Sequence, residues 1–288
     1  MTLEIVDRLA IPGIIDIHSH FMPDAVMAKV WDYFDNAEKA YGVAWPIEYR
    51  FAQDERLAQL RSFGVLAYTS LVYAHKPEMA AWLNDWSLDF AESHQGAIPT
   101  ATFYPDEDAA QYTASAIDRG AQIFKVHLQV GAFDPRDSRL VPVWDLLARH
   151  SIPVVVHCGS GPIPGEFTGV EPISEVITAR PELAVIVAHM GAPEYSGFLD
   201  LAEQFPNVRL DTTMAFTDFM NSLAAFPLSE LGRLHDAGMR GDVLFGSDFP
   251  NIPYPYAEAV TALERLGLGD EWMRAVLFSN ANELFRRI

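Results

Sequence analysis

The 288-residue chain is long enough for one large barrel or two ordinary domains, and half of its residues are apolar, which predicts a globular protein with a substantial core. Thirty-nine acidic against twenty basic residues give a formal net charge of -19, which disfavours binding to nucleic acid or to an anionic membrane. The single cysteine, Cys158, excludes an intramolecular disulfide and is typical of a reducing compartment. With no secretion signal and no apolar run of membrane-spanning length, we expect a cytoplasmic location.

Apolar, β-branched segments alternate with helical patterns along the chain. The predicted strands are 14–18, 65–72, 97–103, 122–128, 153–157, 184–189, 207–211 and 243–246. The predicted helices are 54–63, 77–94, 106–119, 142–150, 172–179, 193–205, 218–237, 255–266 and 271–287. Strands that are apolar on both faces suit a parallel sheet covered by helices. The pattern predicts an α/β fold, a single-domain (β/α)8 TIM barrel over residues 1–288, with a doubly wound open sheet as the alternative.

An aromatic-rich insertion, residues 21–53, follows the first predicted strand. A connection of this length in a compact domain is usually a functional lid or carries small elements of its own. As a lid, its aromatic side chains would line a pocket for a small molecule. An extra helix packed against the side of the barrel is an equally weighted alternative.

Side chains that can bind a metal recur where the predicted strands end. His18 and His20 lie one residue apart at the end of the first strand, so they point the same way if the strand continues. His157 ends the fifth strand, His189 ends the sixth, and Asp248 follows the eighth. Barrel enzymes build their active sites at the carboxyl ends of the strands. We therefore expect these five side chains to meet around one divalent cation.

Five motifs resemble the metal-dependent amidohydrolase superfamily, most closely the branch that contains aminocarboxymuconate-semialdehyde decarboxylase and many hydrolases. They are DIHSH (16–20), VHCG (156–159), AHMG (188–191), LFGSDFP (244–250) and NANELF (280–285). The resemblance implies one divalent metal, usually zinc, bound by His18, His20, His157 and Asp248. It also implies that His189 handles protons or the metal-bound water. Asp248 is expected to accept the proton of that water as well, so both are predicted catalytic residues.

Other polar residues have predicted roles around this centre. Lys125 and His127 share one face of the fourth predicted strand, where an unpaired lysine would be costly to bury. Lys125 resembles the carboxylated lysine that bridges two ions in related enzymes, or a substrate contact in one-metal members, and we favour one metal. His127 is a substrate contact or a hydrogen-bonded structural histidine, and Arg50 is a candidate carboxylate anchor. Asp16 either orients a ligand imidazole or bonds backbone amides.

The predicted function is hydrolysis of a small-molecule amide, ester or lactone by a metal-bound hydroxide. The alternative is nonoxidative decarboxylation of a small unsaturated or aromatic carboxylate, with the metal as Lewis acid. A non-catalytic, metal-stabilised module that binds partners is only a remote alternative. A purely structural zinc site would be closed and would not need a position at the rim of the barrel. Zinc is the expected metal, with manganese, or a second ion bridged by carboxylated Lys125, as alternatives. The expected partner is a small-molecule substrate, and homo-oligomer formation is left open.

Overall fold

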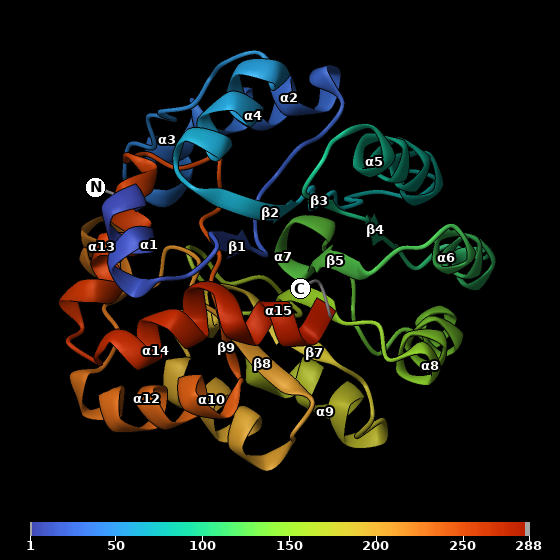
Figure 1. Cartoon of the computed structure of the whole chain (residues 1–288). Helices are drawn as coiled ribbons and strands as arrows, with labels where there is room; N and C mark the ends of the chain where they lie inside the picture. Colours follow the sequence, from blue (N-terminus) through green and yellow to red (C-terminus); the bar gives the residue numbers. More distant parts are fainter. Residues whose placement is uncertain (1, 286–288) are drawn as a thin grey trace.

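In the computed structural model, which describes residues 2–285, every strand pair is parallel. The strands pair in chain order as two sheets, β1-β2-β3 and β4-β5-β6-β7-β8-β9. Helices surround them on the outside (Figure 1). The strands are β1 (Ile14–Asp16), β2 (Val65–Thr69), β3 (Ala97–Ile98), β4 (Thr100–Thr102), β5 (Ile123–His127), β6 (Val154–His157), β7 (Val185–Val187), β8 (Val208–Asp211) and β9 (Val243–Leu244).

One predicted strand, 97–103, is divided at Pro99 into β3 and β4, because proline has no N–H to donate to a neighbouring strand. The two sheets nevertheless remain joined, since the Pro99 carbonyl accepts from the Gln122 amide at 2.8 Å. On the opposite side, the Ile17 amide donates to the Phe245 carbonyl at 3.0 Å and links the end of β1 to the end of β9. The predicted (β/α)8 TIM barrel is therefore confirmed over the doubly wound alternative.

The predicted helices appear in the predicted order, but two of them are interrupted, and the helices Thr2–Leu9 and Leu128–Gly131 were not predicted. The predicted helix 218–237 is two helices, because Pro227 interrupts it. The predicted helix 271–287 contains a π-helical turn at Ala275–Ser279, and its last two residues lie outside the described residues. The helices are α1 (Thr2–Leu9), α2 (Asp24–Phe34), α3 (Ala37–Tyr41), α4 (Gln53–Ser62), α5 (Ala80–Ser93), α6 (Ala109–Asp118), α7 (Leu128–Gly131), α8 (Val141–His150), α9 (Val170–Ala179), α10 (Tyr195–Gln204), α11 (Asp218–Ala224), α12 (Leu231–Arg240), α13 (Tyr256–Arg265), α14 (Asp270–Arg274) and α15 (Asn280–Phe285).

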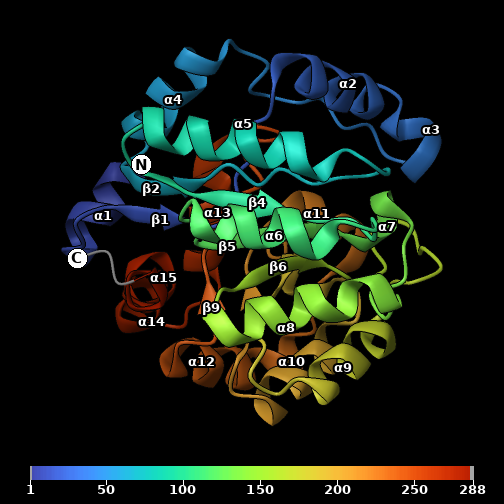
Figure 2. The same ribbon diagram turned by 90° about the vertical axis from the view of Figure 1, so that its right-hand side faces the viewer.

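The barrel interior is filled by an apolar cluster separate from the layer between strands and helices. Its members include the fully buried side chains Ile15, Ile123, Val155 and Ile186. Ala281 of α15 belongs to the same cluster, so the C-terminal helix covers one end of the interior. Figure 2 shows α1, α14 and α15 at this end, and α3 and α7 at the other. The end of the barrel opposite α15 is therefore the one at which an open mouth can form.

The insertion after β1 carries two helices of its own, α2 and α3. Met27 is the buried residue of α2, and it packs in a small cluster with Val72, Ala74 and Leu83 near the start of α5. Both views place α2 close to α4 and α5 along one side of the barrel (Figures 1 and 2). Among the described residues, no helix is long and apolar enough to cross a membrane.

Candidate active site

Three of the predicted ligands converge at the open end of the barrel. His20 Nε2 lies 3.0 Å from Asp248 Oδ1, and His18 Nε2 lies 3.5 Å from the same oxygen. One ligand atom from each of the three residues lies within 4.8 Å of the others, and all three side chains are buried. Two imidazole nitrogens and a carboxylate oxygen in this arrangement form a donor set that a divalent cation can share.

Both imidazoles use Nδ1 for a hydrogen bond, which leaves their Nε2 atoms directed at the Asp248 carboxylate. Nδ1 of His18 donates to the ionised Asp211 carboxylate at 2.7 Å, and Nδ1 of His20 donates to the Leu71 carbonyl at 2.7 Å. In a neutral ring, Nε2 then carries a lone pair rather than a proton. Both lone pairs face the carboxylate of Asp248, which can itself only accept. A cation between them would satisfy all three acceptors, so the donor set fits a metal ion.

Burial acting on His18, and neighbouring groups acting on the two carboxyl groups, keep these side chains in the protonation states that a metal site requires. Burial, together with the charge of Lys125, lowers the pKa of His18 to about 3. Burial alone would raise the pKa of Asp248, but the proximity of His20, His189 and His18 outweighs burial and lowers that pKa. The pKa of Asp211 is lowered in the same way by His18, against the effect of burial. At neutral pH, His18 is therefore neutral and both carboxyl groups are ionised.

His189 lies beside this group, at the end of β7. Its ring centroid is 5.0 Å from that of His18 and 4.8 Å from that of His157. Nδ1 donates to the Thr213 carbonyl at 3.1 Å, and the backbone amide of His189 donates to Asp211 at 2.9 Å. Burial lowers the pKa of His189, so the ring is neutral at neutral pH and Nε2 is free to accept a proton.

His157 and His127 form a stacked pair on the other side of the mouth. They are register partners on β6 and β5, and their rings are 3.8 Å apart with an interplanar angle of 11°. His157 Nε2 contacts the Gly161 carbonyl at 3.2 Å, and His127 Nδ1 accepts from the Val130 amide at 3.3 Å. Among the described residues, His157 does not belong to the group whose ligand atoms lie within 4.8 Å of one another. Its role as fourth ligand stays a prediction.

Lys125 reaches the same centre from β5. Its side chain is buried, and Nζ lies 3.2 Å from His18 Nε2. Burial lowers the pKa of this amine to about 8, against the attraction of Asp211 and Asp248. Strand alternation places Lys125 on the same interior face as Ile123, as the sequence pattern predicted.

Arg50 is not brought together with the histidines. Its guanidinium pairs with Asp35 and donates to the Trp31 carbonyl at 3.2 Å, within the insertion. Its role as a carboxylate anchor stays a prediction.

Asp16 does not orient an imidazole. Its carboxylate accepts from the Ser247 hydroxyl at 2.6 Å, the Tyr256 hydroxyl at 2.9 Å, and the backbone amides of His18 and Ser247, both at 3.2 Å. The structure therefore supports the backbone-bonding alternative. β1 ends at Asp16, so the regular alternation of side chains stops there. Asp16 therefore accepts from Tyr256 of α13, whereas His18 faces Lys125.

Local backbone conformation brings the two predicted catalytic residues to the mouth. His189 (φ 56°) and Asp248 (φ 69°) both adopt the left-handed region, which is uncommon for residues other than glycine and is concentrated at functional sites. Gly246 permits a close approach of the β9 end to β1, because a Cβ there would lie 2.6 Å from the Cβ of His18. The glycine two residues before the acid is thus required by tertiary contact.

Sequence reasoning missed two residues of the site. Asp211 was the last residue of a predicted strand, so the signal that identified His157 and His189 was also available for it. Tyr73 follows β2, and its ring lies 5.9 Å from that of His20 and 5.4 Å from that of His127. No local pattern marks a tyrosine in a loop as a site residue.

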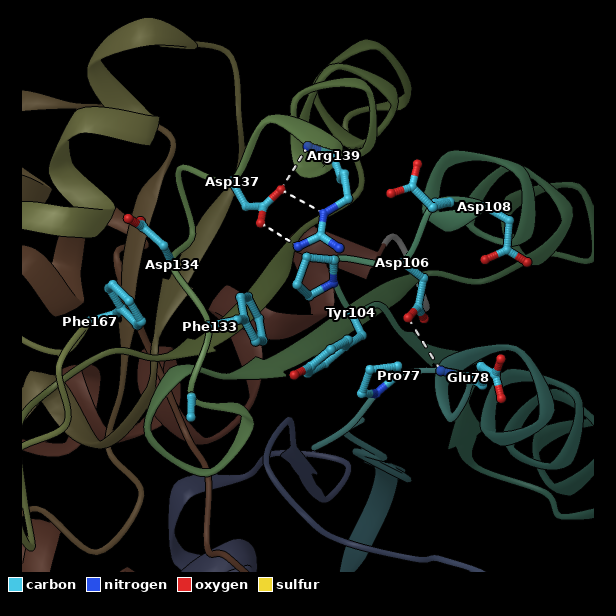
Figure 3. A pocket seen from close by; sticks show the side chains of 13 residues that line it. Pro77, Glu78, Tyr104, Asp106, Asp108, Phe133, Asp134, Asp137, Arg139 and Phe167 are labelled. Atoms are coloured by element: carbon cyan, nitrogen blue, oxygen red, sulfur yellow. Dashed lines mark hydrogen bonds and ion pairs between the residues drawn. The ribbon is translucent and has the colours of Figure 1, made fainter.

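A separate cavity of about 750 Å³ lies between the loops that follow β2, β4 and β5 (Figure 3). Tyr104 and Phe133 form part of its wall. Its polar groups have partners within the chain: Arg139 pairs with Asp137, and Asp106 accepts from the Glu78 amide. Among the described residues, the predicted ligands and catalytic residues do not line this cavity.

A parallel barrel with imidazole and carboxylate donors at its strand ends defines a TIM-barrel enzyme of the metal-binding kind. A family model described as amidohydrolase matches residues 15–287, and the chain therefore belongs to the amidohydrolase family and is an enzyme. A search of curated protein sequences found no significant match.

Solved structures of low sequence identity share the fold. An uncharacterised TIM-barrel protein from Bordetella bronchiseptica is 18% identical, with a TM-score of 0.75 over 95% of this chain and 98% of that one. An amidohydrolase from Burkholderia multivorans with bound zinc is 14% identical, with a TM-score of 0.65 over 96% and 100%. The 5-carboxyvanillate decarboxylase of Novosphingobium aromaticivorans, complexed with manganese and 4-hydroxy-3-methoxy-5-nitrobenzoic acid, is 12% identical, with a TM-score of 0.62 over 96% of both chains.

Proposed function

We propose that this protein is a metal-dependent hydrolase acting on a small-molecule amide, ester or lactone. The observation that carries the proposal is the convergence of His18, His20 and Asp248 within 4.8 Å at the open end of the barrel. Membership of the amidohydrolase family supports hydrolysis over other reactions of a metal site.

His18, His20 and Asp248 would hold one divalent ion, with His157 as the proposed fourth ligand. Zinc is the proposed metal and manganese the alternative, since structural relatives carry one or the other. When bound, such an ion supplies Lewis acidity and lowers the pKa of water to about 7. Because Asp211 and the Leu71 carbonyl fix both Nδ1 atoms as donors, the protein itself sets the orientation of the ligand nitrogens. A second ion bridged by carboxylated Lys125 is the alternative occupancy.

Two residues of the chain would move the protons of hydrolysis. Asp248 is ionised, so its carboxylate accepts a proton from the attacking water and passes it to the leaving group. His189 is neutral, with Nδ1 held by the Thr213 carbonyl, so its Nε2 accepts a hydrogen bond or a proton at the reacting atoms. The 5.0 Å between the ring centroids of His189 and His18, and the 3.5 Å between His18 Nε2 and Asp248 Oδ1, support a shared centre for His189 and Asp248.

The proposed substrate contacts surround this centre. Lys125 carries a donor at the base of the site, and His127 lies on the side opposite Asp248, against Tyr73. Arg50 and the insertion 21–53 are proposed to act from the open end, with the insertion as a lid. Its exposed aromatic side chains, Tyr33 and Phe51, are those available to a ligand.

Nonoxidative decarboxylation of a small unsaturated or aromatic carboxylate is the second candidate. The similarity in fold to a decarboxylase supports it, as does the buried amine of Lys125, which would pair with a carboxylate. The same ligands would hold the metal in either case.

Isotope labelling separates the two reactions. Zinc- or manganese-loaded protein is incubated in 18O-water with panels of amides, esters, lactones and aromatic carboxylates. One 18O atom in the acid product is expected. Release of carbon dioxide without 18O in the organic product would replace hydrolysis by decarboxylation. Failure of both, with metal bound, would favour a non-catalytic binding module.

A further inference from the structure

Arg56 of α4 is an arginine in an unusual environment. Its side chain is 1% exposed, and its Nε and Nη1 find no hydrogen-bond acceptor among residues 2–285. Burial lowers the pKa of this guanidinium to about 10, against the attraction of Asp24. A buried charge without a hydrogen-bonded partner is costly, so another contact has to offset it.

Two aromatic rings provide that contact. The Cζ atom of Arg56 lies 5.3 Å from the centroid of Phe21 and 5.5 Å from the centroid of Trp31. A guanidinium near a ring face at this distance is attracted by the ring quadrupole, and the attraction is strongest when both groups are shielded from water. Phe21 is fully buried and directly follows His20, whereas Trp31 belongs to α2. Arg56 therefore connects a metal-ligand loop to the insertion.

Trp31 also contacts the loop that carries the acidic ligand. Its Nε1 donates to Asn251 Oδ1 at 3.2 Å, and the backbone amide of Asn251 donates to the Asp248 carbonyl at 2.9 Å. The indole of Trp45 donates to the Asn251 carbonyl at 2.8 Å. Trp31 thus contacts the loop of Asp248 directly, and Arg56 links it to Phe21, the residue that follows His20.

We propose that Arg56 is a positioning residue that holds α2 at the metal-site end of the barrel through Trp31 and Phe21. It acts by charge and ring contact rather than by an ion pair, and it does not touch the substrate. The inference rests on the proposed function only where it calls this end of the barrel a metal site. The attachment of α2 is measurable without any substrate.

Hydrogen exchange measured by mass spectrometry on the manganese-loaded protein tests the attachment. The variant Arg56→Met removes the charge and keeps an apolar side chain, and Arg61→Met is the control because Arg61 is exposed on the same helix. We expect amides of α2 (24–34) to exchange about tenfold faster in Arg56→Met, consistent with the loss of desolvated cation–π contacts, and to be unchanged in Arg61→Met. The thermal midpoint is expected not to fall, because replacing a buried unpaired charge by an apolar group is often neutral or stabilising.

Two outcomes would overturn the proposal. One is exchange in α2 within twofold of the Arg61→Met control. The other is a lower thermal midpoint with equal acceleration in the barrel strands, which is the behaviour of a residue that only stabilises the fold.

A double-mutant cycle with Trp31→Leu tests whether Trp31 is the partner. The single Trp31→Leu change should also accelerate exchange in α2, and adding Arg56→Met should accelerate it no further. Additive effects would contradict the proposal. If Arg56→Met does not fold, Arg56→Lys takes its place, with about threefold acceleration expected because a compact ammonium cannot contact both rings as the guanidinium does. That effect must vanish in the Trp31→Leu background, and its persistence would overturn the inference.

Manganese titration separates this inference from the proposed function. All variants should bind manganese within threefold of the wild type, since none removes a proposed ligand. Failure of the wild type to bind manganese or zinc would overturn the proposed metal site, and the attachment of α2 would then be judged by the same exchange comparison on the metal-free proteins.

Discussion

The two sides of the barrel mouth hold their histidines in different ways. On the side of β1, β8 and β9, His18 and His20 donate from Nδ1 to Asp211 and to the Leu71 carbonyl, so that both Nε2 atoms face Asp248. On the side of β5 and β6, the His127 and His157 rings stack 3.8 Å apart, and backbone groups of the following loops contact their nitrogens.

The difference shows what prepares a metal site besides the ligands themselves. The first side has hydrogen-bond acceptors that select one tautomer and direct lone pairs to one point. The second side has ring stacking and loop contacts, which direct no such convergence. The first side is therefore preorganised for a cation, whereas the second side holds the proposed substrate contact His127 stacked on the proposed fourth ligand His157.

The variant His157→Ala is expected to have the largest effect, and it tests whether only the first side of the mouth binds the metal. If His157 is the fourth ligand, the protein should lose its bound metal and all detectable turnover. Metal content after dialysis, measured by atomic emission, is the readout, with the exposed His235→Ala as control. Retention of one metal per chain would assign His157 wholly to the substrate side.

His189→Ala is expected to separate metal binding from chemistry. His189 lies next to both sides but donates to the Thr213 carbonyl, so its loss should leave the metal in place. Turnover should fall by about 100- to 10,000-fold, the usual contribution of a positioned acid or base. Turnover equal to that of the wild type would show that the catalytic assignment is wrong.

The variant Asp211→Asn changes the hydrogen-bond acceptor of His18 and leaves the proposed metal ligands in place. An amide at this position accepts a weaker hydrogen bond from His18 and no longer carries charge, so metal affinity should fall by about 10- to 100-fold. Competition with a chelator of known affinity measures the change. The exposed Asp236→Asn serves as control, and an unchanged affinity would mean that Asp211 does not prepare the site.

The pH dependence of the free energy of unfolding tests whether His18 is held neutral by burial. The pKa of His18 is about 3 in the folded protein against 6.5 when unfolded, so the unfolded chain binds more protons between these values and acid favours unfolding. From pH 6.5 to pH 5, His18 should reduce the free energy of unfolding by about 2 kcal/mol.

The contribution of His18 has to be measured as a difference between two proteins, because Asp16 also titrates in this range. Burial raises the pKa of Asp16 to about 7, so at Asp16 acid favours the folded state. Urea unfolding of metal-free wild type and His18→Asn at both pH values isolates the contribution of His18. Equal pH dependence in the two proteins would show that His18 is not held neutral by burial.

The barrel and the position of its chemistry were predictable from local sequence. All eight predicted strands are present, because continuous apolar runs such as Val154–Val156 have no favourable place other than a covered parallel strand. The predicted ligands His18, His157 and Asp248 were recognisable because each stands where such a run stops. Proline explains the two interruptions, at Pro99 and Pro227, and both were visible in the sequence.

The sequence by itself thus determined the fold class and the end of the barrel at which the donors gather. Tertiary structure alone decided that Asp211, 193 residues from His18, holds its imidazole while nearby Asp16 does not. It also decided that His127 stacks on His157, and that Arg56 lies between Phe21 and Trp31. These contacts depend on strand register and on the path of the insertion, which are set by packing between distant segments rather than by local hydrophobic periodicity.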